Sequence, residues 1–282
     1  MSTQLWTTLD KPRCALWTTL DKTKHGPQRR PPIGGGGRTR AGLRAYEGRP
    51  NHADPRPPAY LSPSRLACYD RCPQLFLERY IEKQIQPPSV ERQFGTAVHY
   101  GIEAHFRGED HEMTFLTDWR ETVKECRAAG LFVATTLTLR GLELIDMVRH
   151  LDLQGEPEKR VTLNVTGIPI PIIGYVDLWT GTHIFDWKTA GAAWGPARVA
   201  REVFQPAIYS QAIAEELHLN EHPKMTIVVL PRIAGELQRF DVTQSPRQVY
   251  DVLERVREIH QRIEGGEFGC KPKCQEHREQ AA

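Results

Sequence analysis

The stretch Gly174-Tyr-Val-Asp-Leu-Trp-Thr-Gly-Thr-His-Ile-Phe-Asp-Trp-Lys-Thr189 carries the most structural information in the chain. Its two arms, Ile172 to Trp179 and Thr182 to Lys188, are rich in the β-branched and aromatic residues that favour strands. Between them, Gly181-Thr182 suits a two-residue turn that begins with glycine. The pattern therefore predicts a β-hairpin.

The register of this hairpin follows from its turn. Thr180 pairs with His183, and stepping outward places Asp177 opposite Asp186, with Cβ atoms about 5 Å apart. Because side chains alternate along a strand, Lys188 shares a face with Asp186. The opposite face is expected to be apolar and to carry Val176, Leu178, Phe185 and Trp187.

Two like charges across a strand pair repel each other, so something positive must lie beside Asp177 and Asp186. Lys188 alone would make a purely structural ion cluster. A hard divalent cation such as Mg²⁺ or Mn²⁺ prefers carboxylate oxygens and suits the same arrangement. From spacing alone, both interpretations stay open.

Three further segments accompany the hairpin, in the order Ser62-Pro-Ser-Arg-Leu-Ala-Cys-Tyr-Asp-Arg-Cys-Pro-Gln-Leu-Phe76, Gly95-Thr-Ala-Val-His99 and Gln205-Pro-Ala-Ile-Tyr209. Together with G-Y-V-D-(x8)-D-W-K-T they resemble the PD-(D/E)XK nucleases, in particular the RecB-like branch with its CRISPR-associated exonuclease relatives. The resemblance implies an α/β fold: a restriction-endonuclease-like core with a mixed central sheet flanked by helices and with extra N-terminal helices.

The pattern of apolar residues agrees with this order of elements. We expect helices over 62–81, with Ser62 or Ser64 as the N-cap, and over 93–107, 112–150, 196–217 and 246–264, with Pro206 placing the start of the fourth near Phe204 or kinking it there. We expect strands over 159–165, 169–179, 182–188, 224–230 and 235–242.

The resemblance also assigns roles to single residues. It implies metal ligation by His99, Asp177, Asp186 and the backbone carbonyl of Trp187, with catalysis by Asp177, Asp186 and Lys188. A lone helical histidine is otherwise typical of a surface or hydrogen-bonded core position. In the helix, Gly95 lies one turn before His99 and leaves room beside the imidazole.

Three secondary candidates complete the predicted site. Gln205 and Tyr209, four residues apart on one helix, face the same way. They form either a polar rim on a packing helix or, as the resemblance implies, a substrate-binding border of the active site. Glu103, one turn beyond His99, either reaches the metal or forms a surface salt bridge.

The six cysteines are too few and too scattered for a disulfide scaffold. Some relatives hold an iron-sulfur cluster, and Cys72, Cys270 and Cys274 match three of its four ligand positions. The fourth position has no cysteine here, and Cys68 or His277 are the available substitutes. A cluster normally uses four thiolates, so a buried, unligated Cys72 is the favoured interpretation.

Composition divides the chain into three parts. Residues 1–60 hold Gly34 to Gly37, many prolines and eleven Lys and Arg against four Asp and Glu, a net charge of +7, whereas the whole chain has +2. We expect a disordered basic tail here, either contacting phosphates or simply solvated, with the repeat Leu5-Trp-Thr-Thr-Leu-Asp-Lys11 and Leu16-Trp-Thr-Thr-Leu-Asp-Lys22 as a docking peptide or an inert duplication. The nuclease domain is 61–269, and 270–282 is a cysteine-containing tail.

These observations predict a metal-dependent deoxyribonuclease, with exonuclease favoured over endonuclease, for DNA repair, recombination or phage DNA processing. The alternatives are an inactive DNA-end-binding or recombination-assembly module, and an RNA nuclease. No GxxxxGK[ST] loop is present, so unwinding would need a helicase partner. There is no apolar run long enough to cross a membrane and no leader-like N-terminus, so we expect a cytoplasmic protein.

Overall fold

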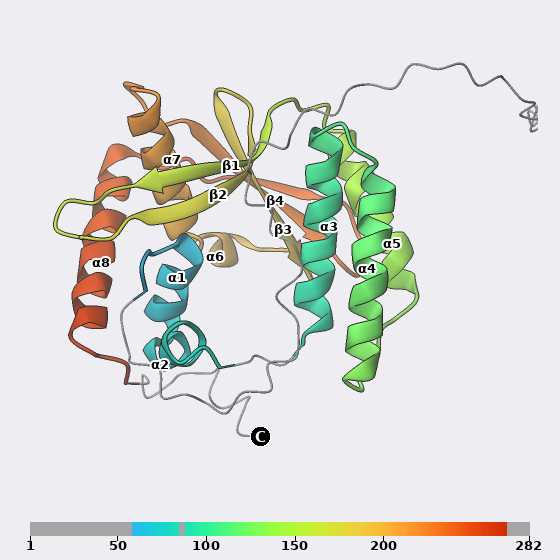
Figure 1. The fold of residues 1–282 in the computed structure, drawn as a ribbon. Helices are drawn as coiled ribbons and strands as arrows, with labels where there is room; N and C mark the ends of the chain where they lie inside the picture. The colour runs from blue at the N-terminus through green and yellow to red at the C-terminus, as the bar shows by residue number, and fades with distance from the viewer. Residues whose placement is uncertain (1–57, 85–87, 270–282) are drawn as a thin grey trace, which may run out of the picture. The chain divides into compact units, whose positions relative to one another are not determined.

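The computed structural model describes residues 58–84 and 88–269, and within them a five-stranded mixed sheet forms the centre (Figure 1). Its strands lie in the order of the sequence, with β3 and β4 parallel and all other neighbours antiparallel. They are β1 (Glu156–Leu163), β2 (Ile172–Trp179), β3 (His183–Ala190), β4 (Lys224–Pro231) and β5 (Gln238–Asp241). This is the mixed α/β sheet that the sequence predicted.

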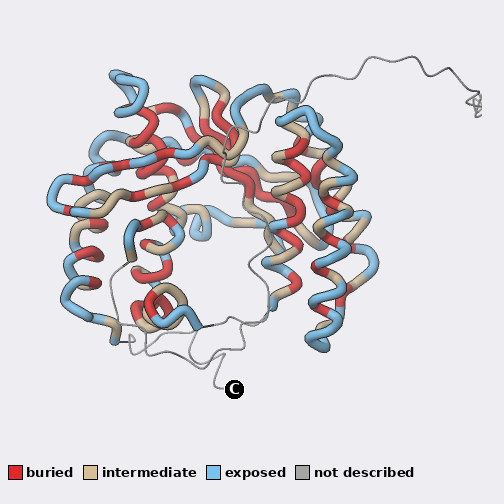
Figure 2. The backbone as a smooth tube through the Cα atoms, viewed as in Figure 1, coloured by how far each residue is buried: buried red, intermediate tan, exposed pale blue. Residues whose placement is uncertain are grey.

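Helices cover both faces of the sheet, in two separate apolar cores. The first core joins the sheet to α1 (Pro63–Arg71), α2 (Pro73–Phe76), α7 (Phe204–Glu216) and α8 (Pro246–Glu264). The second joins it to α3 (Val90–Phe106), α4 (His111–Ala128) and α5 (Thr136–Arg149). Figure 2 shows buried backbone concentrated in the central strands, and all residues of β4 from Met225 to Pro231 are buried.

The predicted hairpin register is confirmed. Thr180 and His183 are joined by a 3.0 Å backbone hydrogen bond, and Leu178 pairs with Phe185. Gly181 has φ +92°, a conformation that glycine adopts without steric cost. The paired ladder ends at Leu178 and Phe185, so the next step outward, Asp177 opposite Asp186, falls where regular pairing of β2 with β3 stops.

The expectation of one apolar and one chemical face needs a correction. Leu178, Phe185 and Trp187 do pack together against α3, α4 and α5, but Val176 lies in the opposite core with α7. Alternation along β2 is therefore interrupted between Val176 and Leu178. At the same level of β1, Glu158 has φ +50°, which breaks the regular pleat. Both faces are apolar, and the polar site occupies the interruption.

Three predicted helices are divided in the structure. The helix expected to run to Ile81 stops at Cys72, whose backbone is extended, because Pro73 follows it and disfavours a helical conformation. A π-helix, η1 (Leu77–Ile81), completes the segment. The Ser62 hydroxyl accepts a hydrogen bond from the Arg65 N–H, so Ser62, rather than Ser64, is the N-cap.

The helix predicted over 112–150 is likewise two helices, α4 and α5, separated by a turn in which Gly130 has φ +77°. The segment predicted over 196–217 divides into α6 (Pro196–Val199) and α7, which begins at Phe204. Pro206 thus lies in the first turn of α7, where its missing N–H leaves no helical hydrogen bond unmade.

The two ends of the described domain are tied to its interior. Leu61 exchanges backbone hydrogen bonds of 3.0 and 2.9 Å with β2 and the residue before it. At the other end, the Tyr69 hydroxyl donates a 2.5 Å hydrogen bond to the Glu267 carbonyl, and Phe268 stacks on Phe76. Of the helices in the described part of the chain, none has the length and apolarity needed to span a bilayer.

Candidate active site

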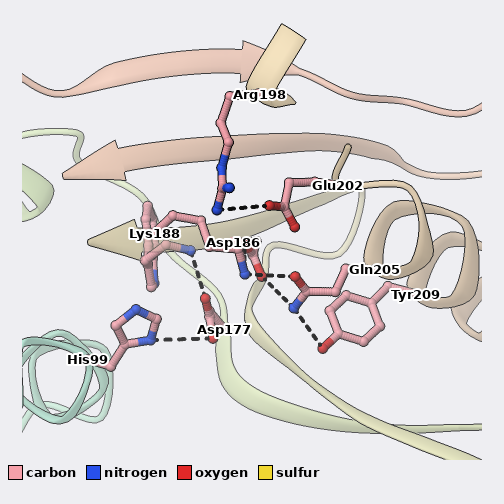
Figure 3. Close-up of polar contacts among 9 residues, drawn as sticks. His99, Asp177, Asp186, Lys188, Arg198, Glu202, Gln205 and Tyr209 are labelled. Atoms are coloured by element: carbon pink, nitrogen blue, oxygen red, sulfur yellow. Dashed lines mark hydrogen bonds and ion pairs between the residues drawn. The ribbon is translucent and has the colours of Figure 1, made fainter. Parts of the chain in front are cut away.

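Strand β3 and helix α7 build the centre of the site from three side chains (Figure 3). The Lys188 ammonium lies 2.7 Å from Asp186 Oδ2 and donates a 2.7 Å hydrogen bond to Gln205 Oε1. The Gln205 amide nitrogen in turn donates to Asp186 Oδ1 at 3.1 Å. Gln205 therefore bridges the acid and the lysine and fixes the orientation of both.

Tyr209 lies one turn beyond Gln205 on α7, as their spacing predicted. Its hydroxyl is 3.4 Å from Gln205 Nε2, and burial raises the pKa of this hydroxyl, so it stays protonated. The tyrosine ring packs over Gly174 of β2, where a Cβ atom would come within 2.4 Å of the ring. A glycine at 174 thus allows α7 to approach the sheet closely enough to bring Gln205 to Asp186.

Asp177 lies between the two strands rather than on a face. Its Oδ2 accepts a 2.7 Å hydrogen bond from the backbone N–H of Trp187, on the neighbouring strand. The carboxylate thus replaces a strand-to-strand hydrogen bond at the point where pairing of β2 with β3 ends. This position allows one carboxylate to reach both the β3 cluster and helix α3.

His99 comes to the same place from α3. Its Nδ1 lies 3.7 Å from Asp177 Oδ1, too far for a hydrogen bond but close enough for the two to share a ligand. The role predicted for Gly95 is wrong in its detail. A Cβ at 95 would lie 2.4 Å from Thr189 Oγ1, so the small residue makes room for β3 and not for the imidazole.

Burial and crowding set the charges in the site. Burial, followed by the Asp186 charge, raises the pKa of Asp177 to about 8, although Lys188 opposes both effects. Burial lowers the pKa of His99, which keeps the imidazole neutral at pH 7. Burial also acts to lower the pKa of Lys188, but the charges of Asp186 and Asp177 outweigh it and raise that pKa.

These groups fit a hard divalent cation by their chemistry. In residues 58–84 and 88–269, no three His, Cys, Asp or Glu side chains form a ready-made cage. Two carboxylates and a neutral imidazole nevertheless converge, and Asp186 is only 2% exposed. Without a cation, the proton on Asp177 relieves the repulsion between the two carboxylates. A cation able to displace that proton suits the site, with His99, Asp177 and Asp186 as the residues to hold it. Ligation by the Trp187 carbonyl stays a prediction.

Of the two roles predicted for Glu103, the structure shows the salt bridge, and metal ligation stays a prediction. Its carboxylate forms a 2.6 Å ion pair with Arg107, four residues further along α3. Its charge also contributes to raising the pKa of Asp177, which places it at the edge of the site. A direct ligand role for Glu103 would require it to leave Arg107.

Three charged residues at the site were not predicted from the sequence. Glu158 lies on β1 between the residues that pair with Leu178 and Val176, and its charge acts to raise the pKa of His99. Arg198 and Glu202 lie near Lys188 in Figure 3, and the Glu202 charge contributes to raising the pKa of that lysine. The i, i+4 spacing of Arg198 and Glu202 was a usable signal, whereas nothing in the sequence marks Glu158.

Cys72 is fully buried, and its Sγ accepts a 3.4 Å hydrogen bond from the Leu75 N–H, which caps α2. The other two predicted cluster ligands, Cys270 and Cys274, lie outside the described residues, as does almost all of the predicted basic tail. Phe268 stacks on Phe76 of α2, so the last described residues lie close to the helix that Cys72 caps. The iron-sulfur cluster stays a prediction.

The sheet order, the flanking helices and the Asp-Lys pair on β3 define a restriction-endonuclease-like α/β protein. A family model described as the PD-(D/E)XK nuclease superfamily matches residues 60–276. The chain belongs to this nuclease superfamily. The match spans all four segments that carried the resemblance in the sequence.

One solved structure supports the fold. A protein of Eubacterium rectale described as a "Putative exonuclease" superposes with a TM-score of 0.54 at 13% identity, covering 78% of this chain and 88% of its own. The structure of SSO0001 is 12% identical over 70% of this chain and 84% of its own, with a TM-score of 0.32. No curated protein matches the chain. At 13% identity the first structure supports the fold alone. The TM-score of the second structure is too low to support a shared fold.

Proposed function

We propose that this nuclease is a Mg²⁺- or Mn²⁺-dependent deoxyribonuclease that acts as an exonuclease in DNA repair, recombination or phage DNA processing. The observation that carries the proposal is the crowding of Asp177 against the buried Asp186, with Lys188 at 2.7 Å from Asp186. Two crowded carboxylates beside an ammonium are the groups that phosphodiester hydrolysis with a divalent cation requires.

Each side chain has a defined part in this reaction. A divalent cation, when bound, supplies polarisation of the phosphodiester and a lowered pKa for water. Asp177 must first give up its proton, because only the carboxylate is a ligand. Lys188 keeps its ammonium charged and lies where it can stabilise the negative charge that develops on the phosphate. Gln205 holds both Lys188 and Asp186 in place.

The experiment that tests this offers end-labelled single-stranded, linear double-stranded and circular DNA to the full chain, with Mg²⁺ or Mn²⁺ and with chelator. We expect metal-dependent loss of the linear substrates and survival of circles, because circles have no ends. Cleaved circles would instead indicate an endonuclease, and digestion of RNA alone would contradict the choice of DNA. DNA binding with no cleavage in either metal would favour the alternative, an inactive DNA-end-binding or recombination-assembly module.

An exonuclease in repair or recombination needs a partner protein that supplies DNA ends. The printed sequence contains no GxxxxGK[ST] loop, and we therefore propose a helicase or recombination protein as the partner class. Co-purification from cells after crosslinking, with and without nuclease digestion of the extract, separates a direct protein partner from one that is bridged by DNA.

A further inference from the structure

The chain that leaves β3 returns past the site before it enters α7. This segment carries Trp194, Arg198 of the short helix α6, and Glu202. Figure 3 draws Arg198 and Glu202 beside Lys188 and Asp186, with the guanidinium of Arg198 pointing toward Glu202. The Glu202 charge contributes to raising the pKa of Lys188, which agrees with this proximity. Through Glu202, which pairs with Arg198 and acts on Lys188, the segment therefore brings a second cation toward the predicted catalytic lysine.

The backbone of Trp194 is fixed by two hydrogen bonds, so its ring can position the Arg198 side chain that lies over it. Its backbone N–H donates a 2.7 Å hydrogen bond to Gln238 Oε1, and its carbonyl accepts one of 3.3 Å from Gln238 Nε2. The central guanidinium carbon of Arg198 lies 4.9 Å from the Trp194 ring centroid, within the range of a cation-π interaction. The ring thus supports the guanidinium from one side.

The ion pair between Arg198 and Glu202 is weak. Arg198 Nη2 lies 3.7 Å from Glu202 Oε1, beyond hydrogen-bond distance, and the Arg198 side chain is 52% exposed. An exposed ion pair of this kind contributes little to stability and exchanges readily. A guanidinium, by contrast, makes paired, charge-assisted hydrogen bonds with phosphate oxygens.

The balance of charge around the site favours a role for Arg198 in binding DNA. Asp186 and Glu202 make the surroundings acidic, while Lys188 already contacts Asp186 and Gln205. A DNA strand that approaches these groups brings further negative charge, which a half-exposed cation beside Lys188 would offset.

We propose that Arg198 binds a backbone phosphate of the DNA strand next to the one being hydrolysed, exchanging Glu202 for it, and that Trp194 is the positioning residue that holds Arg198 for this contact. The proposal rests on the proposed function and adds a substrate subsite to it.

The test compares steady-state cleavage of an end-labelled single strand by the full chain and by variants, over a range of salt concentrations. Arg198→Ala should raise KM about tenfold and leave kcat within about threefold, because the contact binds substrate and transition state alike. The salt dependence of log KM should become shallower by about 0.7, the value for one phosphate contact to a single strand. Arg198→Lys should retain part of the binding.

A matched control comes from α8. Arg247 lies over the Tyr250 ring and pairs with Asp251, four residues on, and it is 79% exposed, so it repeats the arrangement of Arg198 away from the site. Arg247→Ala should leave KM and its salt dependence unchanged. Trp194→Phe should retain the support for Arg198, and Trp194→Leu should raise KM while thermal melting confirms folding.

Binding to the same labelled strand in chelator, followed by fluorescence anisotropy, gives a readout without turnover. Weaker binding by Arg198→Ala than by Arg247→Ala supports the subsite. Equal KM and equal anisotropy for these two variants, with an active wild type, would overturn the subsite and leave the proposed function standing. A wild type that neither cleaves nor binds DNA would overturn both.

Discussion

At the scale of single residues, Lys188 connects stability with activity, because Asp186 is only 2% exposed and the ammonium is the cation beside it. Lys188→Ala leaves a buried carboxylate without this compensation. We expect cleavage to fall by about a hundredfold or more, and metal-free protein to melt at a lower temperature.

Added Mg²⁺ should recover more of the melting temperature in Lys188→Ala than it adds to the wild type, since the cation would meet the unpaired charge. Lys159→Ala is the control, because Lys159 is a similarly shielded lysine, 12% exposed and paired with Glu216 at 2.9 Å, outside the site. Its replacement should leave cleavage intact. Full activity in Lys188→Ala would remove this residue from the mechanism.

The protonation of Asp177 makes stability depend on pH in an unusual direction. The pKa of Asp177 is raised from 3.8 to about 8, so between these values the folded state keeps a proton that the unfolded state has lost. The free energy of unfolding therefore gains a contribution that falls as pH rises through this window. In chelator, Asp177→Asn should be more stable than wild type at pH 9 and equal to it at pH 4, as measured by urea unfolding.

Asp241 is a control, because its contribution to the free energy of unfolding has the opposite dependence on pH. Hydrogen bonds from Thr243 lower the pKa of Asp241, so its contribution is present above the unfolded pKa and is lost as pH falls. Asp241→Asn should therefore be the less stable protein at pH 7 and should match wild type in acid. A wild type that is stabilised relative to Asp177→Asn between pH 4 and 8 would contradict the assigned proton.

At the scale of elements, the approach of α3 to β3 decides whether His99 reaches Asp177. Gly95→Ala would normally favour a helix by about 1 kcal/mol. Here the new Cβ would lie 2.4 Å from Thr189 Oγ1, so we expect destabilisation of about 1–3 kcal/mol by urea unfolding.

Adding Thr189→Ala should restore the stability of the Gly95→Ala variant, because it removes the oxygen that the new Cβ would meet. The double variant should be more stable than Gly95→Ala alone and should recover its cleavage. If Gly95→Ala proves as stable as wild type, the close packing of α3 on β3 is not a constraint on the site.

At the scale of the whole molecule, the uneven charge predicts how the chain meets DNA. The tail of residues 1–60 has a net charge of +7, and the remaining residues must be net acidic because the whole chain has +2. Replacing Arg38, Arg40, Arg44 and Arg49 by Gln should weaken DNA binding at low salt. For every phosphate that one of these arginines binds, the salt dependence should become shallower by about 0.7 to 0.9 in the variant.

The same variant should cleave a saturating substrate at the wild-type rate, since no tail residue belongs to the predicted site. Anisotropy titrations at several salt concentrations measure the binding, and end-labelled DNA measures the cleavage. An unchanged salt dependence would indicate that the tail is merely solvated.

The sequence by itself determined the hairpin, its register and the identity of the groups that meet there. Local rules were sufficient, because a turn beginning with Gly181 fixes the pairing of Thr180 with His183, and the order of the four segments fixes which elements surround them. The family resemblance identified Gln205 and Tyr209 as site residues, and their spacing of four residues sets their common direction on α7.

Only the tertiary structure decided where the carboxylates point and what charge they carry. Asp177 turns between the strands because β2 loses its alternation beside Glu158, which no local pattern reveals. Its proton, the contact of Gly95 with Thr189 and the effect of the Glu202 charge on Lys188 depend on burial and on neighbours distant in sequence. Pairing rules act over a few residues, whereas desolvation and charge act through space.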